Sequence, residues 1–339
     1  MPVAPLEALS PALEGRYAEA TTLAKAASRP AQVGNIALGT AGWTDPSLLK
    51  CRAFYPRGAN APEARLRHYS EHFPMVEVDA TYYSLLDAGI AARWLKWTSP
   101  SFSFNVKAHS SMTGHPIELR RLPRRLRLAA EEAGFAGARA YGAELPSELL
   151  EAMWLEFETF VRPLQDGGKL GCLMLQFPPW FEATRGNARH LERLRERWQD
   201  FRVSIEFRHR SWLAPERRGR VFDLLKQLRY CYVAVDEPSV PGGGVPPDVQ
   251  VTNPELSLVR FHGQNTEGWR KGASVAERFN YLYSEAELMP WVARARSLAS
   301  GSERVHAIFN NCVRDFAVLN AKGLSVLIER PLDVAPPSV

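Results

Sequence analysis

Short apolar segments with the composition of β-strands recur eight times along the chain and constrain its fold more than any other feature. They are rich in Val, Ile, Phe and Leu, and most are bounded by turn residues. Apolar residues at helical spacing separate nearly all of them, as in 62–73 and 148–164. Strands that alternate with helices predict a parallel sheet, and eight repeats favour a closed (β/α)8 TIM barrel over an open, doubly wound sheet. The expected strands are 36–43, 75–82, 102–109, 170–178, 201–209, 231–237, 256–263 and 305–311.

Three segments depart from the regular alternation. Residues 238–254, which contain Gly242, Gly243 and Gly244, predict an irregular loop in place of the sixth helix. An Arg-rich insertion, 110–147, separates the third strand from the fourth. Residues 276–298 predict one or two helices, because Pro290 interrupts the pattern. The first strand is not followed by the GxGxxG fingerprint, which argues against a dinucleotide-binding fold.

The two ends of the chain lie outside the repeating pattern. An Ala-rich N-terminal extension, 1–35, is expected to be part helix and part loop, and 331–339 a flexible tail. The barrel then occupies 36–330 as a single domain. The acidic Glu7 precedes the first basic residue, Arg16, which is the opposite of a secretory signal; the acids of the extension also argue against a mitochondrial leader.

Composition places the chain among ordinary globular proteins, with 45% hydrophobic and 23% charged residues. No apolar run approaches the ~18 residues of a membrane span, and the four cysteines lie far apart without a CxxC pair. We therefore expect a cytoplasmic protein without membrane association, disulfide scaffold or zinc ribbon. The 42 basic and 37 acidic residues give a net charge of +5, which is compatible with an anionic partner.

The predicted strands carry many charges on the face that points to the barrel axis. Side chains alternate along a strand, so Val76 and Val78 on the helix side turn Glu77 and Asp79 inward. A barrel interior is normally filled by Val, Ile and Leu, and buried charges are costly unless they are paired. Either these charges form a closed structural network, or the network opens at the C-terminal mouth, where barrel active sites lie; we favour the second. The full inward set is Glu77, Asp79, Thr81, Asn105, Lys107, His109, Gln176, Ser204, Glu206, Arg208, Asp236, Arg260, His262 and Asn310.

Aromatic residues follow several of the predicted strands, so they are expected around the rim of the barrel. A sugar ring or a nucleobase could stack on such side chains, although each of them could equally close the barrel top by loop packing. They are Trp43, Tyr82, Tyr83, Phe177, Trp180, Phe181, Trp212 and Trp269.

Nine short motifs occur in order and together resemble one known family. They are Gly39-Thr40-Ala41-Gly42-Trp43, Phe54-Tyr55-Pro56, Val76-Glu77-Val78-Asp79-Ala80-Thr81-Tyr82-Tyr83, Gln176-Phe177-Pro178-Pro179, Ser204-Ile205-Glu206-Phe207-Arg208-His209, Ser211-Trp212, Val235-Asp236-Glu237-Pro238, Arg260-Phe261-His262-Gly263 and Phe309-Asn310-Asn311. This pattern resembles the domain of unknown function 72 family, also called YecE-like, over about 36–330. The resemblance implies a TIM barrel but no reaction or substrate. Two departures are Ala41, where the family has a small hydroxyl residue, and the long Arg-rich insertion.

An anion site is the simplest function for the inward cations. Arg208 and Arg260 offer forked donors, and Lys107 adds a point charge. Asn310 and Asn311 precede the last helix, close to the place where many barrels bind phosphate. We therefore expect a phosphate- or sugar-containing small molecule or a nucleotide as ligand. Further expected substrate contacts are Glu77, Asp79, Gln176, Trp43, Tyr82 and Trp212.

Acid–base catalysis by Glu206, Asp236 and His262 would make the protein a hydrolase, lyase or isomerase. These residues end three consecutive strands, and histidine titrates near neutrality, so His262 could donate or accept a proton. Alternatively His262 is a core histidine that orients Arg260 or Asp236. Glu77 with Glu206 also resembles a glycosidase carboxylate pair, but the cations make a neutral glycan less attractive. A divalent metal is an alternative, since Glu, Asp and His at strand tips are suitable ligands. We nevertheless expect no cofactor and no metal, because no HExxH motif occurs and the cations disfavour a metal.

Nucleic-acid binding by surface arginines is the alternative from a different class of function. One cluster lies in the insertion and a second in 185–197, and such clusters can follow a phosphate backbone. Acidic residues intervene, however, and a solvated helix with salt bridges is the commoner explanation. The clusters are Arg120, Arg121, Arg124, Arg125 and Arg127, and Arg185, Arg189, Arg193, Arg195 and Arg197.

Overall fold

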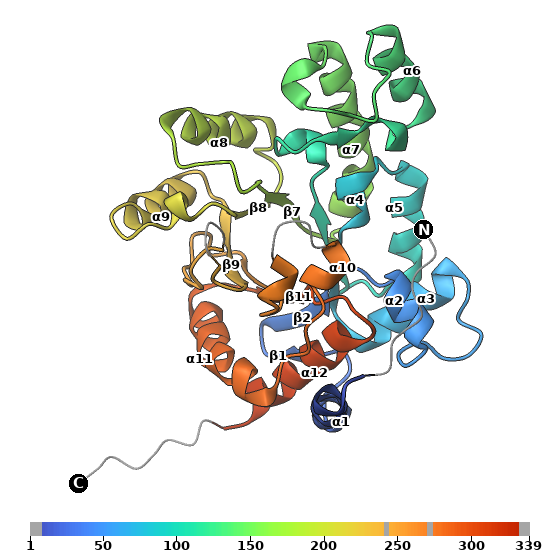
Figure 1. Ribbon diagram of the computed structural model, residues 1–339, viewed down its shortest axis with the longest axis vertical. Helices are drawn as coiled ribbons and strands as arrows, with labels where there is room; N and C mark the ends of the chain where they lie inside the picture. The colour runs from blue at the N-terminus through green and yellow to red at the C-terminus, as the bar shows by residue number, and fades with distance from the viewer. Residues whose placement is uncertain (1–8, 241–243, 270–273, 332–339) are drawn as a thin grey trace.

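The computed structural model describes residues 9–240, 244–269 and 274–331, and eight parallel strands form its centre (Figure 1). The strands are hydrogen-bonded in the order β2-β11-β10-β9-β8-β7-β4-β3. A bridge between Ala41, just after β2, and Glu77 in β3 joins the two ends of this order. The fold is therefore the TIM barrel that the sequence predicts. Its strands are β2 (Ile36–Thr40), β3 (Met75–Val78), β4 (Ser103–Lys107), β7 (Leu170–Gln176), β8 (Val203–Glu206), β9 (Cys231–Asp236), β10 (Ser257–Phe261) and β11 (Val305–Phe309).

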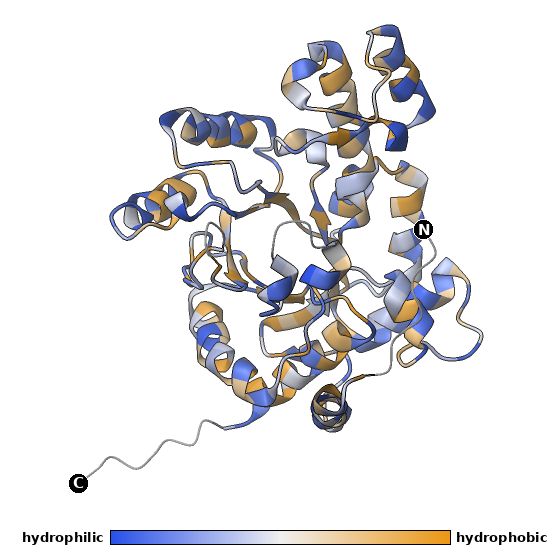
Figure 2. Cartoon of the chain, viewed as in Figure 1, coloured by the Kyte–Doolittle hydropathy of each residue, from blue (hydrophilic) through white to orange (hydrophobic). Residues whose placement is uncertain are grey.

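Helices pack against the outside of the barrel and begin at recognisable caps. The side chains of Asp87 and Thr184 accept hydrogen bonds from the first turns of α5 and α8. Helix α8 buries Leu191 and Leu194 and carries several exposed arginines, so it is largely blue in Figure 2, whereas the strands are largely orange. The outer helices are α3 (Pro62–His72), α5 (Ala88–Trp97), α7 (Ser147–Asp166), α8 (Arg185–Arg197), α9 (Arg218–Gln227), α11 (Glu285–Gly301) and α12 (Phe316–Glu329).

The expected interruption at Pro290 is wrong. Helix α10 (Val275–Arg278) and helix α11 are separated before residue 285, and Pro290 lies inside α11. A capping box between Ser284 and Glu287 fixes the start of α11, and Trp291 is buried against the barrel. Pro290 lacks one backbone N–H and so removes one intrahelical hydrogen bond, a loss that this packing outweighs.

The connection between β9 and β10 contains no helix in its described residues, 237–240 and 244–256, as expected. Gly242 and Gly243 lie outside the described residues. The insertion contributes η1 (Ser110–Met112), β5 (Ile117–Glu118), η2 (Leu119–Arg121), α6 (Arg124–Glu132), β6 (Arg139–Ala140) and η3 (Gly142–Glu144). Helix α6 lies beside α7 and away from the barrel centre (Figure 1).

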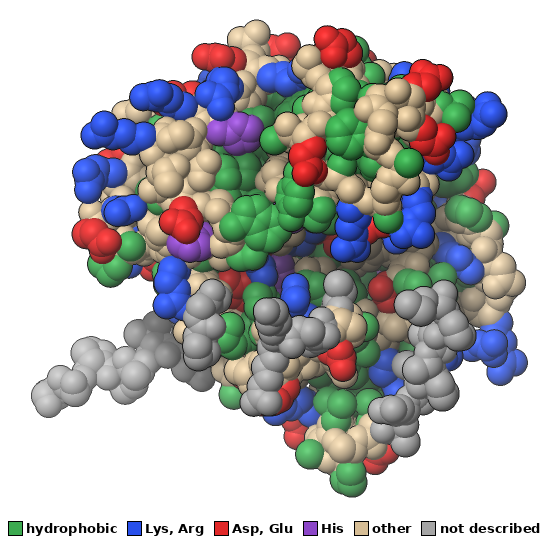
Figure 3. Space-filling model, turned by 45° about the horizontal axis from the view of Figure 1, so that its top comes forward, with side chains coloured by type: hydrophobic (Ala, Val, Ile, Leu, Met, Phe, Trp, Pro, Cys, Tyr) green, Lys and Arg blue, Asp and Glu red, His purple; other side chains and the backbone are tan. Residues whose placement is uncertain are grey.

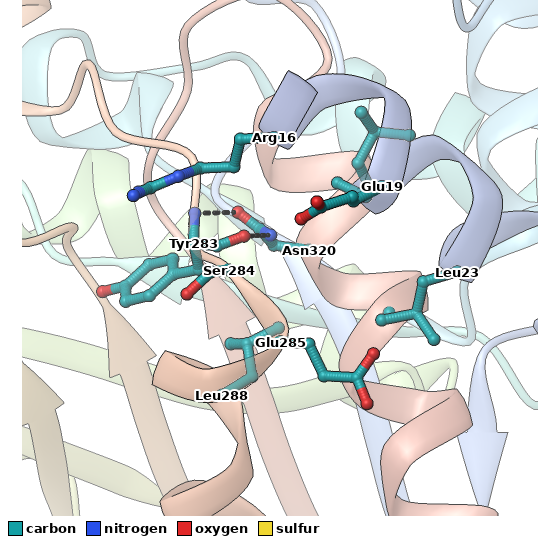
Figure 4. A pocket seen from close by; sticks show the side chains of 11 residues that line it. Arg16, Glu19, Leu23, Tyr283, Ser284, Glu285, Leu288 and Asn320 are labelled. Carbon is teal, nitrogen blue, oxygen red and sulfur yellow. Dashed lines mark hydrogen bonds between the residues drawn. The ribbon is translucent and has the colours of Figure 1, made fainter. Parts of the chain in front are cut away.

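The N-terminal extension contains helix α1 (Pro11–Lys25), which packs against α12, and a two-residue strand β1 (Gln32–Val33) that pairs antiparallel with β2. Ala20 and Phe316 belong to the small apolar cluster between α1 and α12. A cavity of about 130 Å³ lies beside it (Figure 4). Asn320 points into this region, and its side chain is hydrogen-bonded to both backbone groups of Tyr283. The tail, 332–339, lies outside the described residues, and none of the described helices could span a membrane.

Candidate functional site

The floor of the barrel mouth is an ion-pair network around Arg260. Its guanidinium donates from Nε and Nη2 to the two carboxylate oxygens of Glu77, at 2.9 and 2.6 Å, and from Nη1 to Glu206. All three side chains are fully buried. Buried charges persist only when they are paired and hydrogen-bonded, and the bidentate geometry supplies both. Arg260 is thus occupied in holding two carboxylates from β3 and β8.

Glu206 is the most highly connected carboxylate of the network. Besides Arg260, it accepts hydrogen bonds from Gln176 at 2.6 Å, Arg208 at 3.0 Å and His262 at 3.1 Å. Burial works against its ionisation, but Arg260 and His262 hold the pKa of Glu206 well below its usual value. Glu206 is therefore a fixed negative charge at neutral pH.

His262 is held as a neutral ring between two fixed partners. Burial lowers the pKa of His262 to about 3, although Glu206 opposes the shift. At neutral pH its Nε2–H donates to Glu206, and its Nδ1 accepts from the amide of Asn310 at 3.1 Å. This geometry favours the alternative in which His262 orients its neighbours.

The network reaches solvent at Asp79 and Lys107. These side chains form an ion pair of 2.9 Å and are 28% and 8% exposed. Burial raises the pKa of Glu77 to about 7 against the influence of Arg260, whereas Lys107 and Arg260 overcome burial and lower the pKa of Asp79. The negative charge of Asp79 also raises the pKa of Glu77, so the two carboxylates lie close together. Glu77, whose pKa is near neutrality, thus lies beside Asp79, whose side chain reaches solvent.

Asp236 does not join this network, so its expected inward orientation is wrong. In the β9–β10 register, Val235 pairs with the inward Arg260, and Asp236 pairs with Phe261. Phe261 packs on Trp291 of α11, which identifies this side as the helix side. Asp236 instead accepts a hydrogen bond from Gln264 at 2.6 Å.

Glu237 occupies the position that the sequence reasoning gave to Asp236. It is buried and forms an ion pair of 2.7 Å with Arg208, whose Nη1 also contacts Glu206. Strand alternation could have found Glu237, because Cys231, Val233 and Val235 precede it at alternate positions. Their apolar side chains gave no sign that they point inward.

Three other expected contacts lie in structural positions. Trp43 packs edge-on against Trp94 at 5.0 Å, and Trp212 stacks on Phe207 at 4.3 Å; both tryptophans are buried. Asn311 donates to the backbone carbonyl of Tyr281 and to the side chain of Asn320, both at 2.8 Å. None of these three contacts the central network.

Aromatic residues form one rim of the mouth. The ring of Tyr82 lies 4.9 Å from Lys107 Nζ and 5.2 Å from the ring of His115, which comes from the insertion and was not anticipated. His115 in turn contacts Trp180 at 5.8 Å, and Tyr82 contacts Tyr83. Trp180 is 54% exposed and Tyr83 is 40% exposed.

Two cations and a tryptophan form another part of the mouth. The guanidinium of Arg208 lies 4.7 Å from the ring centre of Trp269, and that of Arg278 lies 5.4 Å from it. Burial and the charge of Arg208 lower the pKa of Arg278, so the two cations are close. Figure 3 shows a hollow across this face, with basic and acidic side chains inside it and hydrophobic side chains along its upper edge.

Comparison with known proteins gives the family. Residues 37–338 match the family described as "Protein of unknown function DUF72". The chain belongs to the DUF72 family. It is 30% identical to the UPF0759 protein YunF of Bacillus subtilis over 298 residues, covering 87% of this chain and 95% of that protein.

Solved DUF72 structures have the same fold. A DUF72 family protein from Enterococcus faecalis superimposes with a TM-score of 0.69 and 25% identity, covering 90% of this chain and 99% of that one. A DUF72 family protein from Thermotoga maritima gives 0.68 and 28%, covering 87% and 99%. The family confirms the resemblance seen in the motifs and agrees with the barrel.

The surface arginines of this DUF72 protein are partly neutralised. Arg125 pairs with Glu156, Arg127 lies 4.0 Å from Glu131, and Arg121 stacks on Tyr83 at 5.3 Å. In the second cluster, Arg197 binds Glu151 and Glu158, both at 2.7 Å. These contacts correspond to the salt-bridged helices that the sequence offered as the alternative to nucleic-acid binding.

The described part of the DUF72 chain contains no group of three or more His, Cys, Asp or Glu residues arranged to hold a metal ion. The carboxylates at the mouth are instead matched with cations, as the ion pair of Asp79 with Lys107 shows. Carboxylates and cations arranged in this way can transfer protons and bind charged groups.

Proposed function

We propose that this DUF72 protein is an enzyme that binds an anionic small molecule at the C-terminal barrel mouth and transfers a proton to or from it. The ligand class is a phosphate- or sugar-containing compound or a nucleotide. One observation carries the proposal: the buried ion pair of Arg260 with Glu77 lies beside the ion pair of Lys107 with Asp79, whose side chain is 28% exposed. A purely structural network would not need an end in solvent.

The charged residues of the mouth form two groups: one supports the structure, and the other attracts the ligand. Arg260, Glu206 and His262 are fully buried and bonded to one another, so they hold the floor in place. Lys107 and Arg208 are nearer to solvent and supply the positive charge that attracts an anion.

Proton transfer is assigned to Glu77 and Asp79. A pKa of about 7 keeps Glu77 partly protonated at neutral pH, and the nearby carboxylate of Asp79 lies between it and the mouth. The proton of Glu77 passes to Asp79, and from Asp79 to a leaving or enolising oxygen of the ligand. Hydrolysis, elimination and isomerisation all need such a donor.

Thermal-shift screening with phosphorylated metabolites and nucleotides tests the binding step. A ligand at 100 times its dissociation constant stabilises the folded state by about 2.7 kcal/mol. We expect stabilisation of the wild type and of the surface control Lys96→Met, and little for Lys107→Met. Because Lys107→Met leaves Asp79 unpaired, the double variant Lys107→Met with Asp79→Asn serves as a second probe. Equal stabilisation of wild type and both mouth variants would contradict the proposal.

A further inference from the structure

Two buried donors at the mouth lack acceptors. Nε1 of Trp269 and Nε of Arg278 are inaccessible to solvent, and neither has a hydrogen-bond partner in the part of the chain that the structure describes. Buried N–H groups are nearly always hydrogen-bonded, and each one left unpaired costs free energy. A ligand that displaced the atoms covering these nitrogens would supply the missing acceptors.

Two guanidinium groups meet beside these donors. Arg208 and Arg278 both lie against the ring of Trp269, at 4.7 and 5.4 Å from its centre. Both ion pairs of Arg208 use the same nitrogen, Nη1, with Glu206 at 3.0 Å and Glu237 at 2.7 Å. The positive charges of Arg208 and Arg278 repel each other. An anion between these two guanidinium groups would remove the repulsion and accept a charge-assisted hydrogen bond from each of them.

The surrounding charges leave room for an anion. Glu206 is shared with Arg260, and Glu237 also accepts a hydrogen bond from the backbone N–H of Val245 at 2.9 Å. The two carboxylates facing Arg208 are thus partly satisfied by other donors, whereas Arg278 has no ion pair among the described residues. Arg278 is thus the cation that remains available to an anion at this place.

We propose that Arg208, Arg278 and the indole N–H of Trp269 form a subsite for a tetrahedral oxyanion, such as the phosphoryl group of the substrate. Arg278 and Trp269 bind oxygens of the anion directly, and Glu206 and Glu237 hold Arg208 in position. This inference rests on the proposed function and names the residues that bind the anionic end of its substrate.

Calorimetric titration with inorganic phosphate, sulfate and acetate tests the subsite. The wild type is expected to bind phosphate and sulfate saturably. Arg278→Met should weaken phosphate binding at least ~10-fold, because a charge-assisted hydrogen bond is lost. Trp269→Phe keeps the ring, removes one neutral donor and should weaken binding ~3–10-fold. The matched control is Arg162→Met, since Arg162 also stacks on an aromatic ring, at 4.7 Å from Phe201, but on α7; it should bind as the wild type does.

The outcomes separate this subsite from the proposed function. Arg278→Met and Trp269→Phe could both keep the wild-type phosphate affinity while Lys107→Met loses it. This result would place the anion at Lys107 and overturn the subsite, but it would leave the mouth as the binding site. Absence of phosphate and sulfate binding to the wild type at millimolar concentrations would also overturn it. Tighter binding of acetate than of phosphate would contradict a tetrahedral ligand. Thermal midpoints of the variants show whether each one is folded.

Discussion

Arg260 in β10 holds both carboxylate oxygens of Glu77 in β3, at 2.9 and 2.6 Å, across the interior of the barrel. The two residues are 183 positions apart in the chain, and neither side chain is exposed. Because Arg260 also holds Glu206 on β8, a single guanidinium joins three strands. This arrangement fixes the floor of the mouth, beneath the charged side chains of Asp79 and Lys107, which lie nearer to solvent.

Loss of the ion pairs that Arg260 forms with Glu77 and Glu206 should destabilise the protein. Arg260→Met leaves the buried carboxylates of Glu77 and Glu206 without their main partner, and we expect a loss of about 3–5 kcal/mol in the free energy of unfolding. Urea denaturation measures it. The double variant Arg260→Met with Glu77→Gln should recover part of the loss, since one uncompensated charge is removed. Arg260→Met with wild-type stability would show that the network contributes little.

Buried histidines should make the protein less stable as the pH falls. Burial lowers the pKa of both His262 and His306 from 6.5 to about 3. Below pH 6.5 the unfolded chain therefore binds protons that the folded protein does not, so the free energy of unfolding decreases as the pH falls towards 3. Each such group contributes at most about 1.4 kcal/mol per pH unit in this window.

The measurement for this prediction is chemical denaturation between pH 6.5 and 4.5. Replacing His306 by Asn removes one contribution and should make the pH dependence shallower, and an unchanged slope would contradict the assignment. Glu77 acts in the opposite direction, because its pKa is raised from 4.5 to about 7. The folded protein then binds the extra proton between these values, so Glu77 favours stability at the lower pH.

Glu77 should be the carboxyl group that titrates near neutrality. Carboxyl-carbon NMR of protein labelled at glutamate side chains should show one resonance with a midpoint near pH 7. Glu77→Gln should abolish that resonance, whereas Glu63→Gln, on the exposed face of α3, should leave it. If all glutamate resonances titrate below pH 5, Glu77 is ionised at neutral pH and cannot be the proton donor.

The aromatic rim should select ligands that carry a ring. Stacking of a ring on an exposed aromatic side chain contributes about 1–3 kcal/mol, so Trp180→Ala should weaken binding of a nucleoside monophosphate or a sugar phosphate ~5–150-fold. Inorganic phosphate has no ring, and its affinity should not change. If Trp180→Ala weakened the binding of inorganic phosphate as much as that of the ring-bearing ligand, Trp180 would act only through the structure of the rim.

Glu237 and Asp236 should differ in their effects on ligand binding. Glu237→Gln weakens the ion pair that positions Arg208, so we expect a change in anion affinity of about one order of magnitude. Asp236→Asn lies on the helix side and should leave anion affinity unchanged. The same titration measures both variants, and the reverse order of effects would contradict the assigned orientations.

Strand alternation was sufficient to predict most of the inner network. The eight strand positions and the convergence of Glu77, Glu206 and Arg260 follow from period-two patterning in a closed barrel. The pattern fails at Asp236, because the charge of a side chain at a strand end does not show on which face of the sheet it lies. Only the register with β10 shows that Val235 occupies the inward face.

Other features of the site depend on tertiary structure. The low pKa of His262 comes from complete burial, which the sequence around it does not reveal. His115 reaches the rim from the insertion, and Arg278 from the segment after β10, although neither belongs to a strand. Trp212 follows β8, where the sequence predicts a rim residue. It stacks on Phe207 instead and so belongs to the packing between the loops.

The most direct test of an anion-binding mouth is a crystal soaked in tungstate, a tetrahedral phosphate mimic with strong anomalous scattering. The account predicts an anomalous peak within hydrogen-bond distance of Arg208 or Lys107, at the open end of the network. Peaks confined to surface arginines such as Arg124 or Arg185, with none at the mouth, would contradict it.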